Sequence, residues 1–407
     1  MAAAQQSVPQ ELLFAARQFA SYYGSHPVAE VPGFSSREFG FMFFDRGYVH
    51  RHVGFNDRAD LQKYLAGKAP SHAYYSTAYY EMPAAHTMAE KGWLGADLIF
   101  DLDADHVKGS EGLPYEKMLA RVKEEMIRLY DDFVCSDLGF SEKETEIVFS
   151  GGRGYHIHVY ADSVRKLGSH ERREIVDYIT ATELDLGILF SSTVVDEARS
   201  GRPLKMTKLP EISEGGWYGR ARRAMDSLLL ELQSVPKEEA LAMLVSSGVK
   251  KQQAARLYSA LFEEGRKDRI QTESVLEVLT DREEDIRAFT ALVQKRTVLT
   301  MAGQTDEPVT SDTHRLIRLP GSLHGKSSLK VVTLKRDELT DFEPLRDAVA
   351  DFPDHPVTVY SEKAFLSEPV GGESVPVKEG ANEIPLRTAI FLILRRKVRL
   401  QPPGGTG

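Results

Sequence analysis

The chain has 407 residues, a formal net charge of −9 and 42% hydrophobic residues. This length allows two or three domains, and the hydrophobic share argues against extensive disorder. The acidic balance excludes a histone-like coat for nucleic acid, although a local basic groove remains compatible with it. The single cysteine, Cys135, excludes an intrachain disulfide, and the absence of a signal-peptide pattern or membrane-length apolar run predicts a soluble cytoplasmic protein with no membrane partner.

The first half of the chain alternates helical and strand patterns. Apolar residues at helical spacing predict an amphipathic helix from Pro9 to about Tyr23. Residues 37–55 predict a hairpin that turns at Asp45-Arg-Gly47, and residues 97–103 predict a buried strand. Helical spacing returns from Pro114 to about Phe133.

The second half begins with strand patterns at 146–150 and 155–160, joined by a glycine-rich turn and followed by a helical pattern at 170–190. Residues 216–300 are rich in Ala, Leu, Glu and Lys and predict a helical insertion subdomain. Strand character resumes at 313–334, and residues 401–407 predict a frayed tail. We therefore expect an α/β (α+β) catalytic domain in two parts, 1–215 and 301–360, around the insertion, with a C-terminal segment at 361–407.

Asp101 and Asp103 end the strand Asp97-Leu-Ile-Phe-Asp-Leu-Asp103. Alternate side chains of a strand share a face, so both carboxylates point the same way while Leu98, Phe100 and Leu102 face the core. Two close carboxylates repel each other, and a divalent cation such as Mg²⁺ or Mn²⁺ relieves that repulsion. Taken alone, such a pair is more often a solvated strand end or a turn than a metal site.

A glycine-rich segment, Ser150-Gly-Gly-Arg-Gly-Tyr-His-Ile-His158, lies between two predicted strands. Its glycines would let backbone N–H groups approach phosphate oxygens, and Arg153 adds a forked donor. His156 and His158 share one strand face, so at least one should reach whatever the turn binds. A tight β-turn with surface histidines is the alternative, and a Rossmann or Walker loop is disfavoured because no helix follows.

A third segment runs from Asp306 through Arg315-Leu-Ile-Arg-Leu-Pro-Gly-Ser-Leu-His324. Arg318 and His324 are suited to hold a triphosphate tail. The alternative is that Arg315 and Arg318 form a solvated face and that Asp306 is a loop residue or helix cap.

In this order, the three segments resemble the catalytic small subunit of archaeal and eukaryotic DNA primases, and the form of the third segment is more similar to archaeal members. The resemblance covers about residues 10–335, with a looser match at Arg37-Glu-Phe39 and at Arg51 and Phe55. It implies that Asp101, Asp103 and Asp306 are catalytic and bind two Mg²⁺ or Mn²⁺ ions. It further implies that nucleotide phosphates are bound by a set of polar side chains: Ser150, Arg153, His156, Arg318, His324 and, less closely matched, Arg51.

The family also implies a reaction and partners. We expect template-directed synthesis of short RNA or mixed primers on single-stranded DNA from nucleoside triphosphates, with release of pyrophosphate, in a heterodimer with a primase large subunit. Many members carry a cysteine cluster for zinc, whereas this chain has only Cys135, so we predict no structural zinc.

The same residues are compatible with other functions. The chain could be a related primase-polymerase of repair or replication restart, a non-catalytic nucleic-acid-binding subunit, or a two-metal nuclease. The nuclease explains the predicted phosphate clamp poorly. Arg220, Arg222 and Arg223 after Trp217-Tyr218 have the mixed aromatic and basic character of single-strand binders, and a solvated helix start explains them as well.

Overall fold

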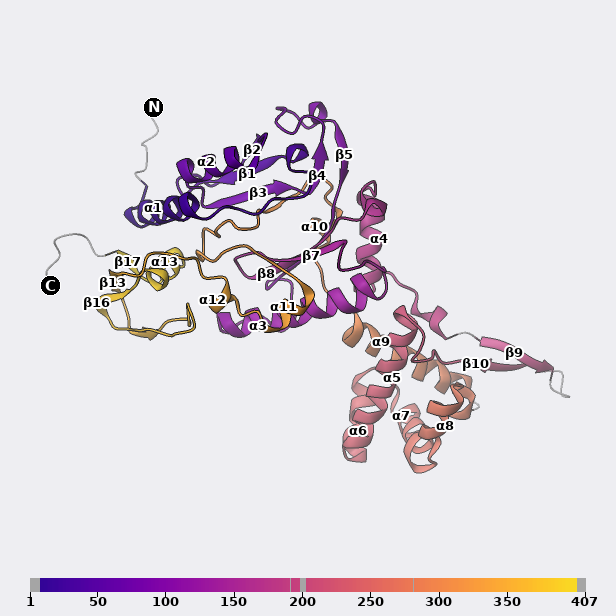
Figure 1. Cartoon of the computed structure of the whole chain (residues 1–407). Coiled ribbons are helices and arrows are strands. Elements are labelled where there is room, and N and C mark those ends of the chain that lie inside the picture. Colours follow the sequence, from indigo (N-terminus) through magenta and orange to yellow (C-terminus); the bar gives the residue numbers. More distant parts are fainter. Residues whose placement is uncertain (1–7, 191, 198–202, 281, 401–407) are drawn as a thin grey trace, which may run out of the picture. The chain divides into compact units, whose positions relative to one another are not determined.

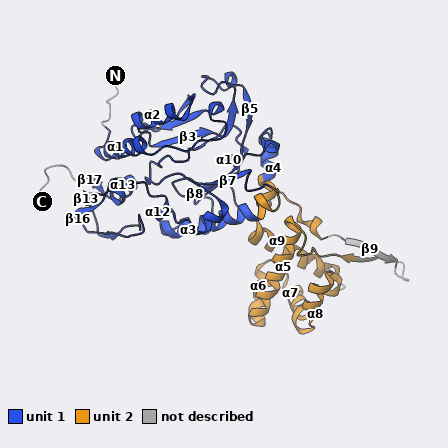
Figure 2. Ribbon diagram, in the orientation of Figure 1, with its two compact units in different colours: residues 1–131, 140–175, 304–407 blue, residues 132–139, 176–303 orange. Residues whose placement is uncertain are grey.

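The computed structural model describes residues 8–190, 192–197, 203–280 and 282–400. These residues form two compact units (Figure 2). The first comprises the described residues of 1–131, 140–175 and 304–407, and the second those of 132–139 and 176–303. Within the described ranges, no helix is long and apolar enough to cross a membrane.

The first unit is mixed α/β, as predicted. Its helices are α1 (Gln10–Ser25), α2 (Arg58–Lys68), α3 (Tyr115–Arg128), α10 (Glu307–Ser311), α11 (Arg336–Asp341), α12 (Pro344–Asp347) and α13 (Leu386–Leu394), and α4 (Ser169–Thr180) begins in it. Its strands are β1 (Phe39–Met42), β2 (His50–Val53), β3 (His72–Ser76), β4 (Ala78–Tyr80), β5 (Trp93–Ala96), β6 (Leu98–Asp103), β7 (Thr145–Phe149), β8 (Gly154–Val159), β11 (Leu316–Arg318), β12 (Val332–Leu334), β13 (Pro356–Ser361), β14 (Phe365–Leu366), β15 (Pro376–Val377), β16 (Gly380–Pro385) and β17 (Arg399–Leu400).

Two antiparallel four-stranded sheets organise the first unit (Figure 1). The first sheet has the strand order β11-β3-β1-β2, and the second has the order β12-β7-β8-β6. Helices α1 and α2 cover the first sheet, while α3 packs on β6 and β8 of the second. The predicted hairpin at 37–55 is confirmed by the antiparallel pairing of β1 with β2.

One hydrophobic core is shared by both sheets. It contains Phe19 of α1, Phe41 of β1, Ile317 of β11 and Ile99 of β6, each at most 4% exposed. Ile99 lies on the same face of β6 as Asp101 and Asp103, since alternate residues of a strand share a face. The two carboxylates therefore follow a core residue on the side of β6 that faces the first sheet.

The C-terminal region adds to this core. Helix α13 is apolar nearly all round, which is typical of a buried helix. Its Leu386, Ile390 and Leu394 join the same core as α1. The described residues of the expected C-terminal segment, 361–407, are a packed part of the first unit, because the apolar surface of α13 must be removed from water. The expected fraying at 401–407 lies outside the described residues.

The second unit is mainly helical. It contains α5 (Gly216–Ser234), α6 (Lys237–Ser246), α7 (Lys251–Tyr258), α8 (Arg266–Glu273) and α9 (Glu283–Met301), together with the hairpin of β9 (Ser192–Glu197) and β10 (Pro203–Thr207). Its extent, 132–139 and 176–303, is wider than the insertion expected at 216–300. The difference arises because Trp217 of α5 packs against Phe133 and donates a hydrogen bond to Tyr178 O at 2.9 Å.

The helical pattern expected at 170–190 is interrupted. Helix α4 ends at Thr180, and Ala181 and Glu183 follow with φ of 56° and 57°. A left-handed backbone ends a helix. A short 3₁₀ turn, Leu186–Leu189, replaces the last predicted turns.

Candidate active site

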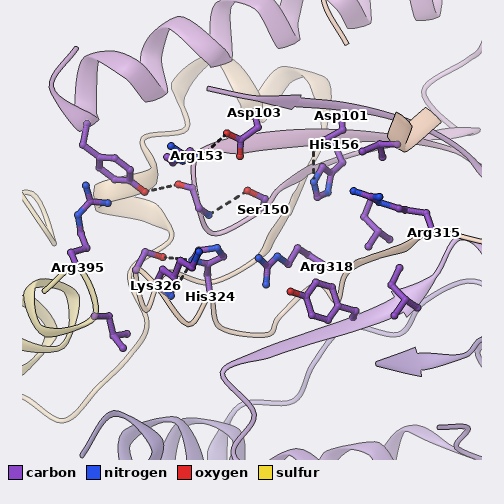
Figure 3. A pocket seen from close by; sticks show the side chains of 18 of the residues that line it. Asp101, Asp103, Ser150, Arg153, His156, Arg315, Arg318, His324, Lys326 and Arg395 are labelled. Carbon is purple, nitrogen blue, oxygen red and sulfur yellow. Dashed lines mark hydrogen bonds and ion pairs between the residues drawn. The ribbon is translucent and has the colours of Figure 1, made fainter. Parts of the chain in front are cut away.

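A cleft of about 740 Å³ in the first unit contains most of the predicted site residues (Figure 3). One side is formed by β6, β8 and the turn before β8, and the other by β3, β11 and the segment after it. Six arginine and lysine side chains and two carboxylates line it. The cleft is therefore basic within an acidic chain, as required for binding a polyanion.

The two carboxylates lie opposite the strand that follows the glycine-rich turn. In the β6–β8 register, Asp101 pairs with His156 and Asp103 with Gly154. His156 Nε2 lies 3.1 Å from Asp101 Oδ1, and Arg153 Nη2 lies 3.4 Å from Asp103 Oδ1. Each carboxylate is thus held beside a group that can carry positive charge.

The glycines of the turn permit close approach of the backbone. A Cβ on Gly154 would lie 2.3 Å from Leu102 O, so a side chain there would separate β8 from β6. Gly151 has φ of 75°, and a Cβ on it would lie 2.8 Å from His324 Cβ. The turn consequently packs against the His324 segment. Within the turn, Ser150 Oγ accepts a hydrogen bond from Gly152 N at 3.3 Å.

Arg318 lies across the cleft from Asp101 and Asp103, and His324 lines the cleft beside the glycine-rich turn. Arg318 stands 4.7 Å over the Tyr74 ring, its partner in the β3–β11 register, and its Nη1 contacts His72 Nδ1. Burial, and then the charge of Arg318, lower the pKa of His72 to about 2. Burial and the same arginine hold the pKa of His324 well below its ordinary value, so both imidazoles are neutral at physiological pH.

Asp306 is positioned by the strand that carries the aspartate pair. It precedes α10, and its backbone N donates to Asp101 O at 2.9 Å. Burial raises the pKa of its carboxyl, the charge of His106 opposes that effect, and the charge of Asp101 adds to it. Asp306 adjoins the cleft through Asp101 but is not among the residues that line it.

The predicted residues separate into those that the structure gathers and those that it does not. The cleft is lined by the following predicted residues: Asp101, Asp103, Ser150, Arg153, His156, Arg318 and His324. Arg51 instead forms a bidentate contact with the buried Glu38, at 3.0 and 3.1 Å, and does not line the cleft. His158 is fully buried and bonds the Tyr75 hydroxyl at 3.2 Å, so of the two histidines only His156 reaches the cleft.

The expected single-strand surface around Arg220 and Arg222 is corrected by the structure. Arg220 is 2% exposed and pairs with Asp137 at 2.5 Å. Arg222 is 6% exposed and pairs with Asp226 at 3.1 Å. Both arginines lie on the buried face of α5 and are not available to a template, whereas Arg223 is exposed.

Sequence reasoning missed several residues of the cleft. Lys326, Arg395 and Lys397 add three cations, and Tyr74 and Tyr115 add two aromatic walls. The basic run Arg395-Arg-Lys397 was a visible signal. Its location could not be foreseen, because it depends on how α13 packs.

The acids suit a divalent cation by their chemistry. Asp101 and Asp103 offer the hard oxygen ligands that Mg²⁺ and Mn²⁺ prefer. Burial, and to a smaller extent the charge of Asp101, raise the pKa of Asp306, and a bound cation would favour its charged form. Among the described residues, no group of three or more His, Cys, Asp or Glu side chains is already arranged to hold a metal ion. The carboxylates contact His156, Arg153 and His106 instead.

Residues 100–334 match the family model described as DNA primase small subunit. The chain belongs to this family. It is 39% identical to the DNA primase small subunit PriS of Methanocella arvoryzae, over 96% of this chain and 98% of that protein. It is 40% identical to PriS of Methanothrix thermoacetophila, over 93% and 96%, and 42% identical to PriS of Methanosphaerula palustris, over 95% and 97%.

The resemblance to DNA primase small subunits, and to archaeal members in particular, is thereby confirmed. The matched residues include both aspartates of β6, the glycine-rich turn and the segment through His324. They do not include the C-terminal region that supplies Arg395 and Lys397.

Proposed function

We propose that this chain is the catalytic subunit of a DNA primase, a nucleotidyltransferase that makes primers on single-stranded DNA for replication. Family membership over nearly the whole chain supports the activity. The observation that carries the chemistry is the cleft in which the Asp101–Asp103 pair faces Arg318 and His324. Carboxylates on one side and phosphate-binding groups on the other are what template-directed phosphoryl transfer requires.

The acids would hold the cations of the reaction. Asp101, Asp103 and Asp306 are the proposed ligands of two Mg²⁺ or Mn²⁺ ions, displacing the contacts with His156, Arg153 and His106. Bound in this way, divalent cations lower the pKa of an attacking hydroxyl and neutralise charge on phosphate. His156, released from Asp101, would be free to bind the nucleotide, and Arg153 would do so on leaving both Asp103 and its nearer partner Asp105.

The remaining side chains would orient the triphosphate. Arg153 and Arg318 would donate to phosphate oxygens from opposite sides of the cleft. Neutral His324 would offer a ring nitrogen without adding charge: its Nδ1 lies 3.2 Å from Ser327 Oγ, and its Nε2 lies beside Gly152 of the glycine-rich turn. Ser150 offers a hydroxyl on the same turn. Arg51 would contribute to nucleotide binding only if it leaves Glu38.

Partners follow from the family. The relatives are named small subunits, and we propose that this chain acts with a primase large subunit, on single-stranded template and with nucleoside triphosphates. The acidic net charge of −9 disfavours strong template binding by this chain alone.

The test is synthesis on unprimed single-stranded DNA with labelled nucleotides and Mg²⁺ or Mn²⁺, with and without the large subunit. A primase starts products from nucleotides alone. Extension of an added primer without any unprimed products would contradict the proposal and would favour a repair polymerase. Template binding without incorporation would favour a non-catalytic subunit.

A further inference from the structure

The C-terminal region places two cations in the active-site cleft. Arg395 follows α13 directly, and Lys397 lies two residues further on. Both line the cleft together with Lys326 and residues of the glycine-rich turn. Figure 3 shows Arg395 and Lys326 on the same side of the cleft. None of the three motifs contains them, and they lie outside residues 100–334.

Arg395 is held in place mainly by stacking on aromatic rings. Its guanidinium stands 4.2 Å from the centre of the Tyr115 ring and 5.2 Å from that of Phe391. Its Nε is buried and has no hydrogen-bond partner among the described residues. Stacking on aromatic faces orients the guanidinium, and its two terminal Nη groups, rather than the buried Nε, are the donors that an anion in the cleft would contact.

Glu368 holds the second cation beside the first. Its Oε1 lies 2.6 Å from Lys397 Nζ and 3.9 Å from Arg395 Nε, and its side chain is 13% exposed. One carboxylate between two cations leaves a net positive charge at this end of the cleft. Glu368 therefore positions the two cations without cancelling their field.

The same region is linked to the glycine-rich turn. The Tyr115 hydroxyl donates to Gly152 O, so the ring that carries Arg395 also holds the turn. A Cβ on Gly152 would lie 3.0 Å from His324 Nε2. Arg395 and Lys397 thus adjoin the turn and His324, the groups assigned above to the triphosphate. In Figure 3 the labelled Arg395 lies at the opposite end of the cleft from Arg315.

We propose that Arg395 and Lys397 form a subsite for the terminal phosphates of the nucleoside triphosphate and for the pyrophosphate that leaves. The proposal rests on the proposed function and adds a specific residue pair to it. A polyphosphate tail that extends from the aspartates past the turn reaches this end of the cleft. Arg395 and Lys397 adjoin the glycine-rich turn and His324, which are assigned to the triphosphate. We therefore expect the pair to bind a compact polyphosphate rather than a nucleic-acid backbone.

The experiment is equilibrium binding of ATP, inorganic pyrophosphate and AMP to the full chain with Mg²⁺, measured by calorimetry. We expect Lys397→Ala to weaken ATP and pyrophosphate binding about tenfold and to leave AMP binding within twofold, as loss of one charge-assisted contact predicts. Arg399→Ala is the matched control, because Arg399 is 74% exposed, pairs with Glu362 and does not line the cleft. Arg395→Lys tests the first cation in the same binding measurement. It retains the charge and much of the packing but removes the forked guanidinium donors, so ATP and pyrophosphate binding should weaken while AMP binding is retained.

Steady-state turnover gives a second measurement. In primer extension, Lys397→Ala should raise KM for the nucleotide about tenfold, with kcat and the Kd for single-stranded DNA within twofold of the parent. Unchanged ATP and pyrophosphate affinity would overturn the inference, as would a loss of DNA affinity at unchanged KM, which would assign the pair to a template surface. Because binding needs no turnover, a parent that binds pyrophosphate through Lys397 but makes no primers would refute the proposed function alone.

Discussion

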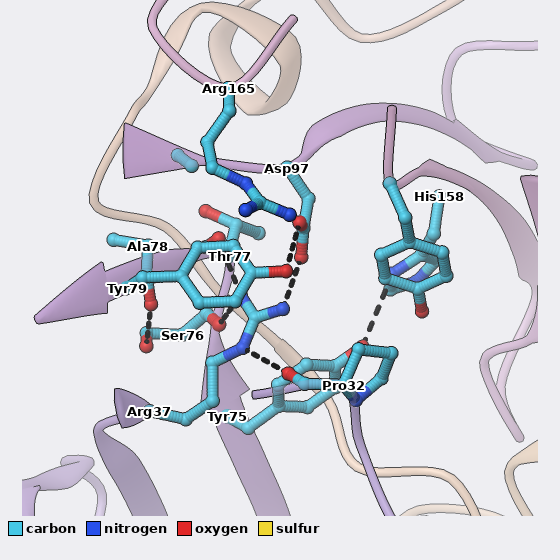
Figure 4. Close-up of polar contacts among 12 residues, drawn as sticks. Pro32, Arg37, Tyr75, Ser76, Thr77, Ala78, Tyr79, Asp97, His158 and Arg165 are labelled. Carbon is cyan, nitrogen blue, oxygen red and sulfur yellow. Dashed lines mark hydrogen bonds and ion pairs between the residues drawn. The ribbon is translucent and has the colours of Figure 1, made fainter. Parts of the chain in front are cut away.

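Arg37 and Asp97 form a fully buried ion pair, with Arg37 Nη2 2.6 Å from Asp97 Oδ2 and side chains 0% and 1% exposed (Figure 4). Arg37 precedes β1 of the first sheet, and Asp97 precedes β6 of the second. Arg37 also donates to Pro32 O and Thr77 O, and its guanidinium stands 3.6 Å from the centre of the Tyr79 ring. The pair therefore fixes the start of β6, the strand whose far end bears Asp101 and Asp103.

We predict that Arg37→Met destabilises the protein by about 3–5 kcal/mol, because it leaves the Asp97 carboxylate buried without its cation. Urea unfolding measures the change. The double variant Arg37→Met, Asp97→Leu should recover part of the loss, and Arg399→Ala, which breaks an exposed pair, should cost less than about 1 kcal/mol. Equal effects of Arg37→Met and Arg399→Ala would contradict this account of the pair.

Gly154→Ala should lower both stability and turnover. The new Cβ would lie 2.3 Å from Leu102 O, so β8 must move away from β6 and from Asp103. We expect a cost of about 1–3 kcal/mol, typical of overpacking, and at least about a tenfold loss of kcat from misplacement of the carboxylate. The control is Gly67→Ala in α2, where the structure has nothing within 4 Å of the added Cβ. A Gly154→Ala protein with parental kcat would show that the β6–β8 spacing does not position Asp103.

Stability should fall steeply in mild acid. Burial lowers the pKa of His72 to about 2 and holds the pKa values of His158 and His324 well below the ordinary 6.5. Below about pH 6.5 these three histidines become protonated in the unfolded chain but stay neutral in the native protein. Each group then lowers the free energy of unfolding by about 1.4 kcal/mol per pH unit, and above pH 6.5 the effect vanishes.

The measurement is urea unfolding between pH 5.5 and 7.5 for the parent and for His158→Gln. Below pH 6.5 the free energy of unfolding of His158→Gln should depend on pH less steeply than that of the parent, by the contribution of one histidine. Substitution of the exposed His170 by Gln should leave the parental pH dependence unchanged. Identical slopes for the parent and His158→Gln would mean that native His158 is protonated in this range.

Arg51→Ala separates a structural role from a nucleotide contact. Arg51 donates to both oxygens of buried Glu38, which also lies 3.6 Å from buried Lys91. As long as Arg51 stays on Glu38, the substitution should reduce stability by about 1–3 kcal/mol and leave KM for the nucleotide within twofold. A large rise in KM at parental stability would instead show that Arg51 leaves Glu38 to bind the triphosphate.

The sequence was sufficient to predict those parts of the site whose residues are close together in the chain. Asp101 and Asp103 are two residues apart, and strand alternation alone places them on one face. The glycine-rich turn lies between two recognisable strands, so its packing against β6 follows from the pairing of β6 with β8. The opposition of Arg318 to this turn became predictable only through the family resemblance, since the two are far apart in sequence.

Contacts that depend on tertiary packing were not predictable in the same way. Arg395 reaches the cleft because α13 buries its apolar surface beside α1, a choice that no local pattern reveals. Arg220 was misjudged although a signal existed. Trp217, Ala221, Ala224 and Leu228 form a helical apolar stripe, and Arg220 lies within that face.

The most direct test of the central claim compares nucleotide incorporation on single-stranded template by the parent, Asp103→Ala and Asp162→Ala, with DNA binding measured in parallel. Asp162 is the control, because its side chain is 90% exposed and does not line the cleft. We expect Asp103→Ala to lose at least about a hundredfold in kcat. Its affinity for DNA should stay within twofold of that of the parent, and Asp162→Ala should have parental activity. Primer synthesis by Asp103→Ala within a few fold of the parent would contradict the claim that the aspartate pair of β6 is the catalytic centre.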